Sequence, residues 1–146
     1  MFDCQGLAVQ AIHKNREVLL ASLQALGIGK VVAQYSGGGD SGDVCELHVI
    51  PESAVPGLQA TEVTETYVHR DYTGPETGWQ FSLRTRVVPL EEALHDFTLD
   101  WLEIHHPGWE NDDGGDGSMS IDIAAGTCRL EHREFYTEST GYEYEL

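Results

Sequence analysis

Two adjacent histidines and several carboxylates lie close together in residues 101–123, whose sequence is WLEIHHPGWENDDGGDGSMSIDI. Carboxylate and carbonyl oxygens on a flexible glycine-rich loop are the ligands that Ca²⁺ or Mg²⁺ prefers, and histidine binds transition metals. One hypothesis is therefore a metal-binding protein or a metal-dependent enzyme that uses a divalent cation. Its candidate ligands are His105, His106, Asp112, Asp113 and Asp116.

The spacing of these residues fits known metal motifs poorly. If Asp112 is the first ligand of a calcium-binding helix-loop-helix motif, Gly114 falls at the third position and Ile123 at the twelfth, so the bidentate glutamate is missing. Successive helical residues point about 100° apart, so His105 and His106 rarely bind one ion. The alternative is a solvated loop whose glycines make turns, and then no cofactor is expected.

The charge of the chain indicates another kind of function. With 8 basic and 25 acidic residues, the net charge is −17 at pH 7. Residues 91–146 hold 15 acidic and 2 basic residues, a net charge of −13. Such a surface repels phosphate backbones, so direct binding of nucleic acid is not expected. The expected partner is a basic protein or a nucleoprotein complex.

The acidic segment also carries aromatic side chains, which supply contact area at protein interfaces. An array of carboxylates can take the place of DNA phosphates on a nucleic-acid-binding protein. The favoured hypothesis is a small, non-enzymatic acidic protein that inhibits or regulates such a partner, for example an anti-CRISPR or DNA-mimic protein. The residues expected to contact the partner are Asp100, Glu103, Trp109, Glu110, Asp112, Asp113, Asp116, Glu131 and Glu134.

A second motif, Gly-Asp-Ser-Gly at residues 39–42, matches the tetrapeptide around the nucleophile of trypsin-like proteases. Those enzymes need a longer chain, two barrels, and a histidine and an aspartate in a fixed arrangement. A hydrolase here would have to use His48, His105 or His132 as its base, and nothing in the sequence supports the choice. A hairpin loop is the better interpretation, with no catalytic residue assigned.

The hydrophobic periodicity predicts an α+β fold: an antiparallel β-sheet of four to six strands with two helices packed on one face. A single domain is expected over residues 1–146, because the chain is long enough for one core. The expected elements are a helix (7–27), a hairpin (30–50), a loop (52–60), a hairpin or projecting arm (61–88), a helix (90–106), an acidic loop, a hairpin (118–136), and a tail that is a loop or a short edge strand (137–146).

The three cysteines, Cys4, Cys45 and Cys128, are far apart and form no CxxC pair, which is typical of reduced thiols in the cytosol. Cys45 and Cys128 lie in alternating strand patterns and are expected to be small core residues. The chain has no long apolar run and no signal pattern at its start, so we expect no membrane association. The expected location is the cytoplasm of a bacterial or phage-infected cell. The oligomeric state stays open.

Three stretches together resemble a small, acidic, functionally uncharacterised family of bacteria, plasmids and phages. They are YSGGGDSGDV (35–44), the segment 90–123, and the closing LEHREFYTESTGYEYEL. Asp40, Ser41 and Gly42 match the glycine-rich loop of that family. The second loop is matched by Gly108, Trp109, Glu110, Asn111 and Gly114. The resemblance implies a domain type and a phage or mobile-element origin, and it implies no activity.

Overall fold

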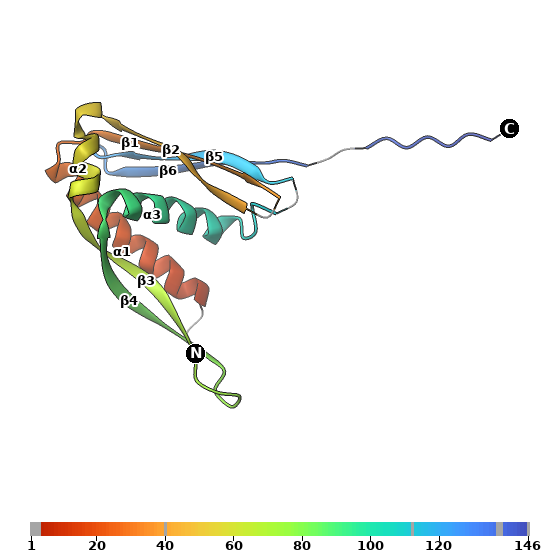
Figure 1. Cartoon of the computed structure of the whole chain (residues 1–146), viewed down its shortest axis with the longest axis horizontal. Coiled ribbons are helices and arrows are strands. Elements are labelled where there is room, and N and C mark those ends of the chain that lie inside the picture. Colours follow the sequence, from red (N-terminus) through yellow and green to blue (C-terminus); the bar gives the residue numbers. More distant parts are fainter. Residues whose placement is uncertain (1–3, 40, 112, 137–138, 146) are drawn as a thin grey trace.

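The computed structural model describes residues 4–39, 41–111, 113–136 and 139–145. Its elements follow one another along the chain as in Figure 1. They are α1 (Cys4–Ala25), β1 (Lys30–Gly38), β2 (Ser41–Ile50), the 3₁₀ helix η1 (Glu52–Ala54), α2 (Val55–Ala60), β3 (Glu62–Tyr72), β4 (Trp79–Pro89), α3 (Leu90–His105), β5 (Gly115–Asp122) and β6 (Thr127–Glu134). Among the described residues, no helix is long and apolar enough to cross a membrane.

The strands form two antiparallel sheets. The larger sheet has four strands in the order β2-β1-β5-β6, and β3 pairs with β4 in a separate two-stranded sheet. This second sheet, with its turn at 73–78, is the arm. The expected α+β class is confirmed, and the hairpin of residues 61–88 takes the projecting form.

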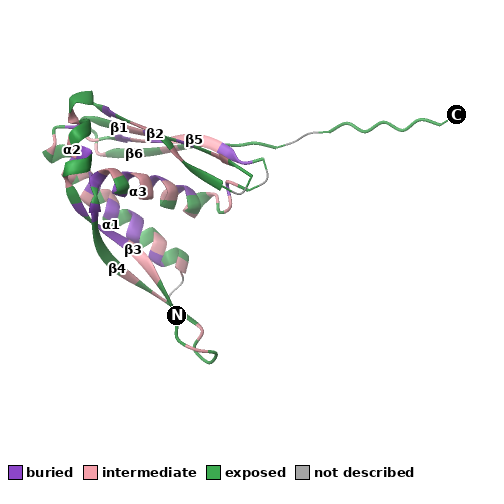
Figure 2. Cartoon of the chain, viewed as in Figure 1, coloured by how far each residue is buried: buried purple, intermediate pink, exposed green. Residues whose placement is uncertain are grey.

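One core joins the two sheets through the helices. In Figure 1, α3 and α1 lie on the same side of the four-stranded sheet, and the arm packs against α1. Buried residues are concentrated where these elements face one another (Figure 2). The most enclosed side chains come from all of these layers and include Leu19, Leu23, Val31, Ala33, Leu58, Leu90, Leu94, Met119 and Ile121.

Three segments differ from the sequence-based expectation. The first helix spans Cys4–Ala25, so it begins and ends before the expected 7–27. Residues 52–60, expected as a loop, contain η1 and α2, because Pro56 fits the first turn of a helix and Leu58 is drawn into the core. The last hairpin begins at Gly115 instead of 118, so part of the expected acidic loop is strand.

The expectation that Cys45 lies in the core is wrong. The pairing of β1 with β2 shifts between Gln34 and Tyr35, whose partners are Glu46 and Val44, so Cys45 is the unpaired residue of a β-bulge. The bulge reverses the alternation, so Cys45 is exposed and Val44 packs against the core instead. Cys128 is partly buried and packs against the core.

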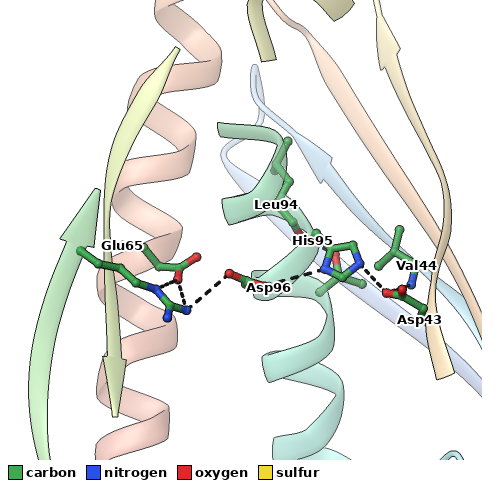
Figure 3. Close-up of polar contacts among 8 residues, drawn as sticks. Asp43, Val44, Glu65, Leu94, His95 and Asp96 are labelled. Atoms are coloured by element: carbon green, nitrogen blue, oxygen red, sulfur yellow. Dashed lines mark hydrogen bonds and ion pairs between the residues drawn. The ribbon is translucent and has the colours of Figure 1, made fainter. Parts of the chain in front are cut away.

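A row of charged groups fixes α3 between the β1–β2 hairpin and the arm (Figure 3). Asp43 pairs with His95, whose ring lies 3.8 Å from Asp96. Arg86 contacts Asp96 at 3.6 Å and Glu65 at 2.7 Å. Burial raises the pKa of Glu65 to about 7, and the hydrogen bond from Arg86 opposes that rise.

The buried Asn15 attaches α1 to the arm. Its Nδ2 donates to the backbone carbonyl of Thr66, and its Oδ1 accepts from the Thr66 backbone N–H, both at 2.8 Å. Both residues are buried, so water does not replace these bonds easily. The side chain thus supplies the partners that a further strand would supply at this edge of β3.

We predict that Asn15→Ala lowers the free energy of unfolding by roughly 2–4 kcal/mol, because it leaves a buried donor and a buried acceptor unpaired. Chemical denaturation followed by circular dichroism measures the change. The control is Lys14→Ala on the exposed side of the same helix, where the expected change is within about 0.5 kcal/mol. Equal stability of Asn15→Ala and the wild type would contradict this role.

Candidate functional site

The site begins with the indole of Trp109, which packs on the glycine-lined end of the β1–β2 hairpin. Gly37 and Gly42 are directly opposite each other in that hairpin. A Cβ at Gly37 would lie 2.9 Å from the Trp109 ring, and one at Gly42 would lie 2.7 Å from its Cζ2 atom. These distances are shorter than real Cβ contacts, so the ring can rest here only because both positions lack side chains. Trp109 is 7% exposed as a result.

On one side of Trp109 lies an acidic groove of about 380 Å³. The groove runs between the start of β2 and the C-terminal half of α3. Its lining consists of Ser41, Gly42, Leu99, Asp100, Glu103, Trp109 and Glu110. The Oε2 atom of Glu110 is buried and has no hydrogen-bond partner among the described residues. Three carboxylates in one hollow give the groove a strong attraction for cations.

The groove alters the titration of Asp100. Desolvation raises its pKa from 3.8 to about 6, and the negative charges of Asp96 and Glu103 add to the rise, while Arg86 opposes it. By surface area Asp100 is an exposed residue. We therefore attribute the shift to protein on one side of the carboxylate and expect a smaller effect on stability than full burial would give.

Trp109 also borders a second group of residues, in which three potential ligands gather between the end of α3 and the end of β6. The ligand atoms of His106, His132 and Glu134 all lie within 4.8 Å of one another. His106 Nδ1 is 3.1 Å from Glu134 Oε1, and His132 Nε2 is 3.7 Å from the same oxygen. Trp109 contacts this cluster edge-on, with its ring centroid 6.2 Å from that of His132.

Tyr35 holds the His132 ring in place. Its hydroxyl donates to the Glu131 carbonyl at 3.0 Å and lies 2.8 Å from His132 Nδ1. Burial raises the pKa of Tyr35 to about 12, so the hydroxyl keeps its proton at neutral pH. Burial, and then the neighbouring His106, lower the pKa of His132, which favours its neutral imidazole.

Two further glycines make room for this arrangement. A Cβ at Gly117 would lie 2.8 Å from Tyr35 Cζ, and one at Gly115 would lie 2.9 Å from His132 Cε1. Both glycines are in β5, beneath the side chains that they admit. The solvated-loop interpretation gave them turns, but in the fold they admit these rings and the close approach of the β6 backbone, since the carbonyls of Glu131 and Arg133 would lie nearest to a Cβ at Gly117 and Gly115.

The acidic residues predicted to contact a partner separate into several groups. Asp100, Glu103 and Glu110 come together in the acidic groove. Trp109 also lines the groove, but it is buried and has little surface with which to contact a partner. The other predicted contact residues lie elsewhere. Asp116 accepts two hydrogen bonds from Arg133 at 2.7 and 2.8 Å, and Glu131 pairs with Arg129 at 3.0 Å. Glu134 is in the histidine cluster, Asp113 is exposed, and Asp112 lies outside the described residues.

The predicted metal ligands are not brought together as a set. His106 faces β6, but His105 lines a different groove between α1 and α3. The bond to Arg133 lowers the pKa of Asp116 and occupies its carboxylate. Asp116 also belongs to β5, so residues 115–122 form a strand where the later part of a calcium-binding loop would lie. The described residues form one candidate metal cluster, which uses His106 with His132 and Glu134.

Sequence reasoning did not combine His132 with Glu134, although a signal was present. Residues two apart on a strand point to the same face of the sheet, so the pattern His132-x-Glu134 places both side chains together. Tyr35 offered no such signal, because its contact with His132 depends on how β1, β5 and β6 align.

The chain was compared with protein families, curated proteins and solved structures. The model of a family of unknown function (DUF6878) matches residues 11–146. No curated protein and no solved structure matches the chain. The comparisons therefore give a family and no activity.

The pKa of Asp100 predicts a pH-dependent effect of Asp100→Asn. A folded-state pKa above the unfolded value means that the protonated group stabilises the fold, and this stabilisation is lost as the pH rises through 6. We expect Asp100→Asn to raise the midpoint of thermal unfolding by roughly 2–4 °C at pH 8 and to leave it unchanged at pH 3.5.

Thermal scans across this pH range measure the effect, and Asp71→Asn in the exposed arm is the matched control. A rise in the midpoint of the same size at both pH values would contradict the assignment, since it would not depend on the charge.

Proposed function

The chain belongs to that family of unknown function, and we propose that it is a non-enzymatic protein-binding factor whose acidic groove receives a basic side chain of its partner. The observation that carries this proposal is the groove itself, where the carboxylates of Asp100, Glu103 and Glu110 gather beside Trp109. A net charge alone would attract cations without selecting a place for them.

The groove favours a lysine or arginine for two physical reasons. The buried Oε2 of Glu110 has no partner among the described residues, so an N–H donor from outside would supply its missing hydrogen bond. The raised pKa of Asp100 reflects an unfavourable charge at neutral pH, and a nearby cation would stabilise that charge. The planar guanidinium of arginine suits this groove best, because it can donate to two carboxylates at once.

The distribution of charge supports the nature of the partner. Residues 91–146 carry a net charge of −13, and they include most of the groove. A partner that normally binds nucleic acid presents a basic surface of the opposite sign, and the carboxylates would occupy it in place of phosphates. The proposed partners are nucleic-acid-handling proteins or nucleoprotein complexes, with a CRISPR effector complex as the concrete example.

We further propose where the protein comes from and in which compartment it acts. The resemblance to phage, plasmid and bacterial proteins favours a phage or mobile element as the source. It also favours the cytoplasm of a bacterial or phage-infected cell as the site of action. An inhibitor carried by a phage or plasmid would meet host nucleic-acid-handling complexes in that compartment.

A metal site in the 105–116 loop stays an untested prediction, and no observation here favours it. His105 and Asp116 are directed to different neighbours, and Asp112 lies outside the described residues. The candidate metal cluster uses different ligands and is argued separately below.

We predict that the double variant Glu103→Gln and Glu110→Gln weakens binding to an arginine-rich peptide and to the CRISPR effector complexes that bind the wild type by at least about tenfold at low salt. Fluorescence anisotropy with labelled peptide, and competition by duplex DNA for each complex, measure the change. The affinity of the wild type should fall steeply between low and high salt, because the attraction is between exposed charges.

The matched control is the double variant Glu62→Gln and Glu76→Gln, which removes the same charge from exposed positions of the arm. It should keep most of the wild-type affinity. Equal losses in both double variants would show that only net charge matters, and unchanged affinity in the groove variant would contradict the proposal.

A further inference from the structure

We propose that His106, His132 and Glu134 bind one divalent transition-metal ion, with Zn²⁺ as the best fit. Trp109 borders this site as well as the acidic groove, but the two share no other residue, and the metal site does not depend on the proposed binding of a partner. Two imidazoles and one carboxylate are a ligand set that protein zinc sites use.

The first observation is the state of His132. Its side chain is 4% exposed, and its Nε2 atom is buried with no hydrogen-bond partner among the described residues. A buried polar atom without a partner costs free energy, so such an atom in a folded protein points to a partner from outside the chain, such as a water molecule or an ion. The nearest candidate, Glu134 Oε1 at 3.7 Å, is too far for a hydrogen bond but within range of a shared ion.

The hydrogen bonds around His132 bear on whether its Nε2 atom can donate a lone pair to a metal ion. The Tyr35 hydroxyl has one proton, which it donates to the Glu131 carbonyl at 3.0 Å. With that proton so used, the bond between His132 Nδ1 and the Tyr35 oxygen, 2.8 Å long, takes the tautomer in which Nδ1 carries the proton and donates it. In this tautomer the neutral ring has a lone pair on Nε2, the atom that lies near Glu134. Histidine ligands in metal sites typically have the other ring nitrogen fixed by such a bond.

The distances match the size of a metal site. Ligands about 2.0–2.1 Å from a tetrahedral ion lie about 3.3 Å from one another. The His106 Nδ1 and Glu134 Oε1 atoms are 3.1 Å apart, and His132 Nε2 is 3.7 Å from the same oxygen. An ion at the centre of the three atoms requires only small side-chain movements.

The surroundings favour a site with an open position. His106 and Glu134 have side chains that are 37% and 63% exposed, so solvent reaches the cluster from one side. Arg133, which precedes Glu134 in β6, donates both of its side-chain hydrogen bonds to Asp116. Its positive charge is therefore paired with Asp116 and not with Glu134. Three protein ligands leave one tetrahedral position for water or an exogenous ligand.

A bound ion would also join two parts of the fold. His106 follows directly after α3, whereas His132 and Glu134 lie at the end of β6. The loop between His106 and β5 carries Trp109 and Glu110 of the groove. Metal binding should therefore hold the end of α3 against the end of β6 and raise the stability of the whole chain.

The test is a titration of EDTA-stripped, full-length protein with Zn²⁺, followed by calorimetry, and with Co²⁺, followed by its visible absorption. We expect one ion per chain. Zn²⁺ at 100-fold its dissociation constant should raise the unfolding midpoint by roughly 5–10 °C. Glu134→Gln and His132→Asn should each weaken binding at least about 100-fold and abolish this rise.

Two variants separate metal binding from a general effect on folding. His105→Ala changes the neighbouring histidine, which faces another groove, and should bind Zn²⁺ as the wild type does. Tyr35→Phe should weaken binding about 10–100-fold without removing a ligand, since it frees the His132 ring. In EDTA, Glu134→Gln should unfold at the wild-type temperature, because that side chain is largely exposed.

Several outcomes would overturn the proposal. They are no bound ion in the wild type, a response only to Ca²⁺ or Mg²⁺, or unchanged Zn²⁺ affinity in both Glu134→Gln and His132→Asn. The binding of arginine-rich peptide by the EDTA-stripped protein is measured separately, so failure of the metal site leaves the proposed function standing.

Discussion

The contact between Trp109 and the two glycines of the β1–β2 hairpin is the constraint on which the rest of the site depends. The ring lies so close to Gly37 and Gly42 that a methyl group at either position would meet it at 2.9 Å or less. Close packing of this kind is costly to disturb, because atoms in protein interiors have little free volume. The loop that follows α3 therefore has a fixed position over the sheet.

This one contact brings together residues that are far apart in the chain. Trp109 meets Tyr35 edge-on at 5.2 Å between ring centroids, and Tyr35 in turn holds His132. The neighbouring Glu110 is directed into the acidic groove, and His106 is directed toward β6. The groove and the histidine cluster thus both border Trp109.

Much of the fold was accessible from the sequence. The apolar residues of α3 recur at helical spacing, and those of β1 and β5 alternate with polar ones. Such spacings can be read from the sequence because they depend only on which side of an element faces the core. The two loops that carry the family resemblance, around Gly42 and Trp109, were recognised as a set, but nothing in a sequence states that they touch. The bulge at Cys45 was missed because it reverses an alternation that looks regular in the letters alone.

The candidate sites were only partly accessible for the same reason. Asp100 and Glu103 are three residues apart on α3, so they share a helix face, but the placement of Glu110 beside them depends on the turn after the helix. The histidine cluster depends on residues 26 positions apart or more, namely His106, His132 and Tyr35, and on strand register that local patterns do not reveal. The sequence also does not reveal why Gly115 and Gly117 are glycines, because a glycine that makes room for a neighbouring ring cannot be told in the sequence from one that makes a turn.

The measurement that tests this account most directly is the indole N–H resonance of Trp109 in a ¹H–¹⁵N correlation spectrum. Zn²⁺ and an arginine-rich peptide are added in separate titrations. The account predicts that both ligands shift this resonance, since Trp109 borders both sites, while the resonance of Trp79 in the arm stays in place. A Trp109 resonance that neither ligand moves, with shifts elsewhere in the spectrum, would contradict the claim that Trp109 borders both sites.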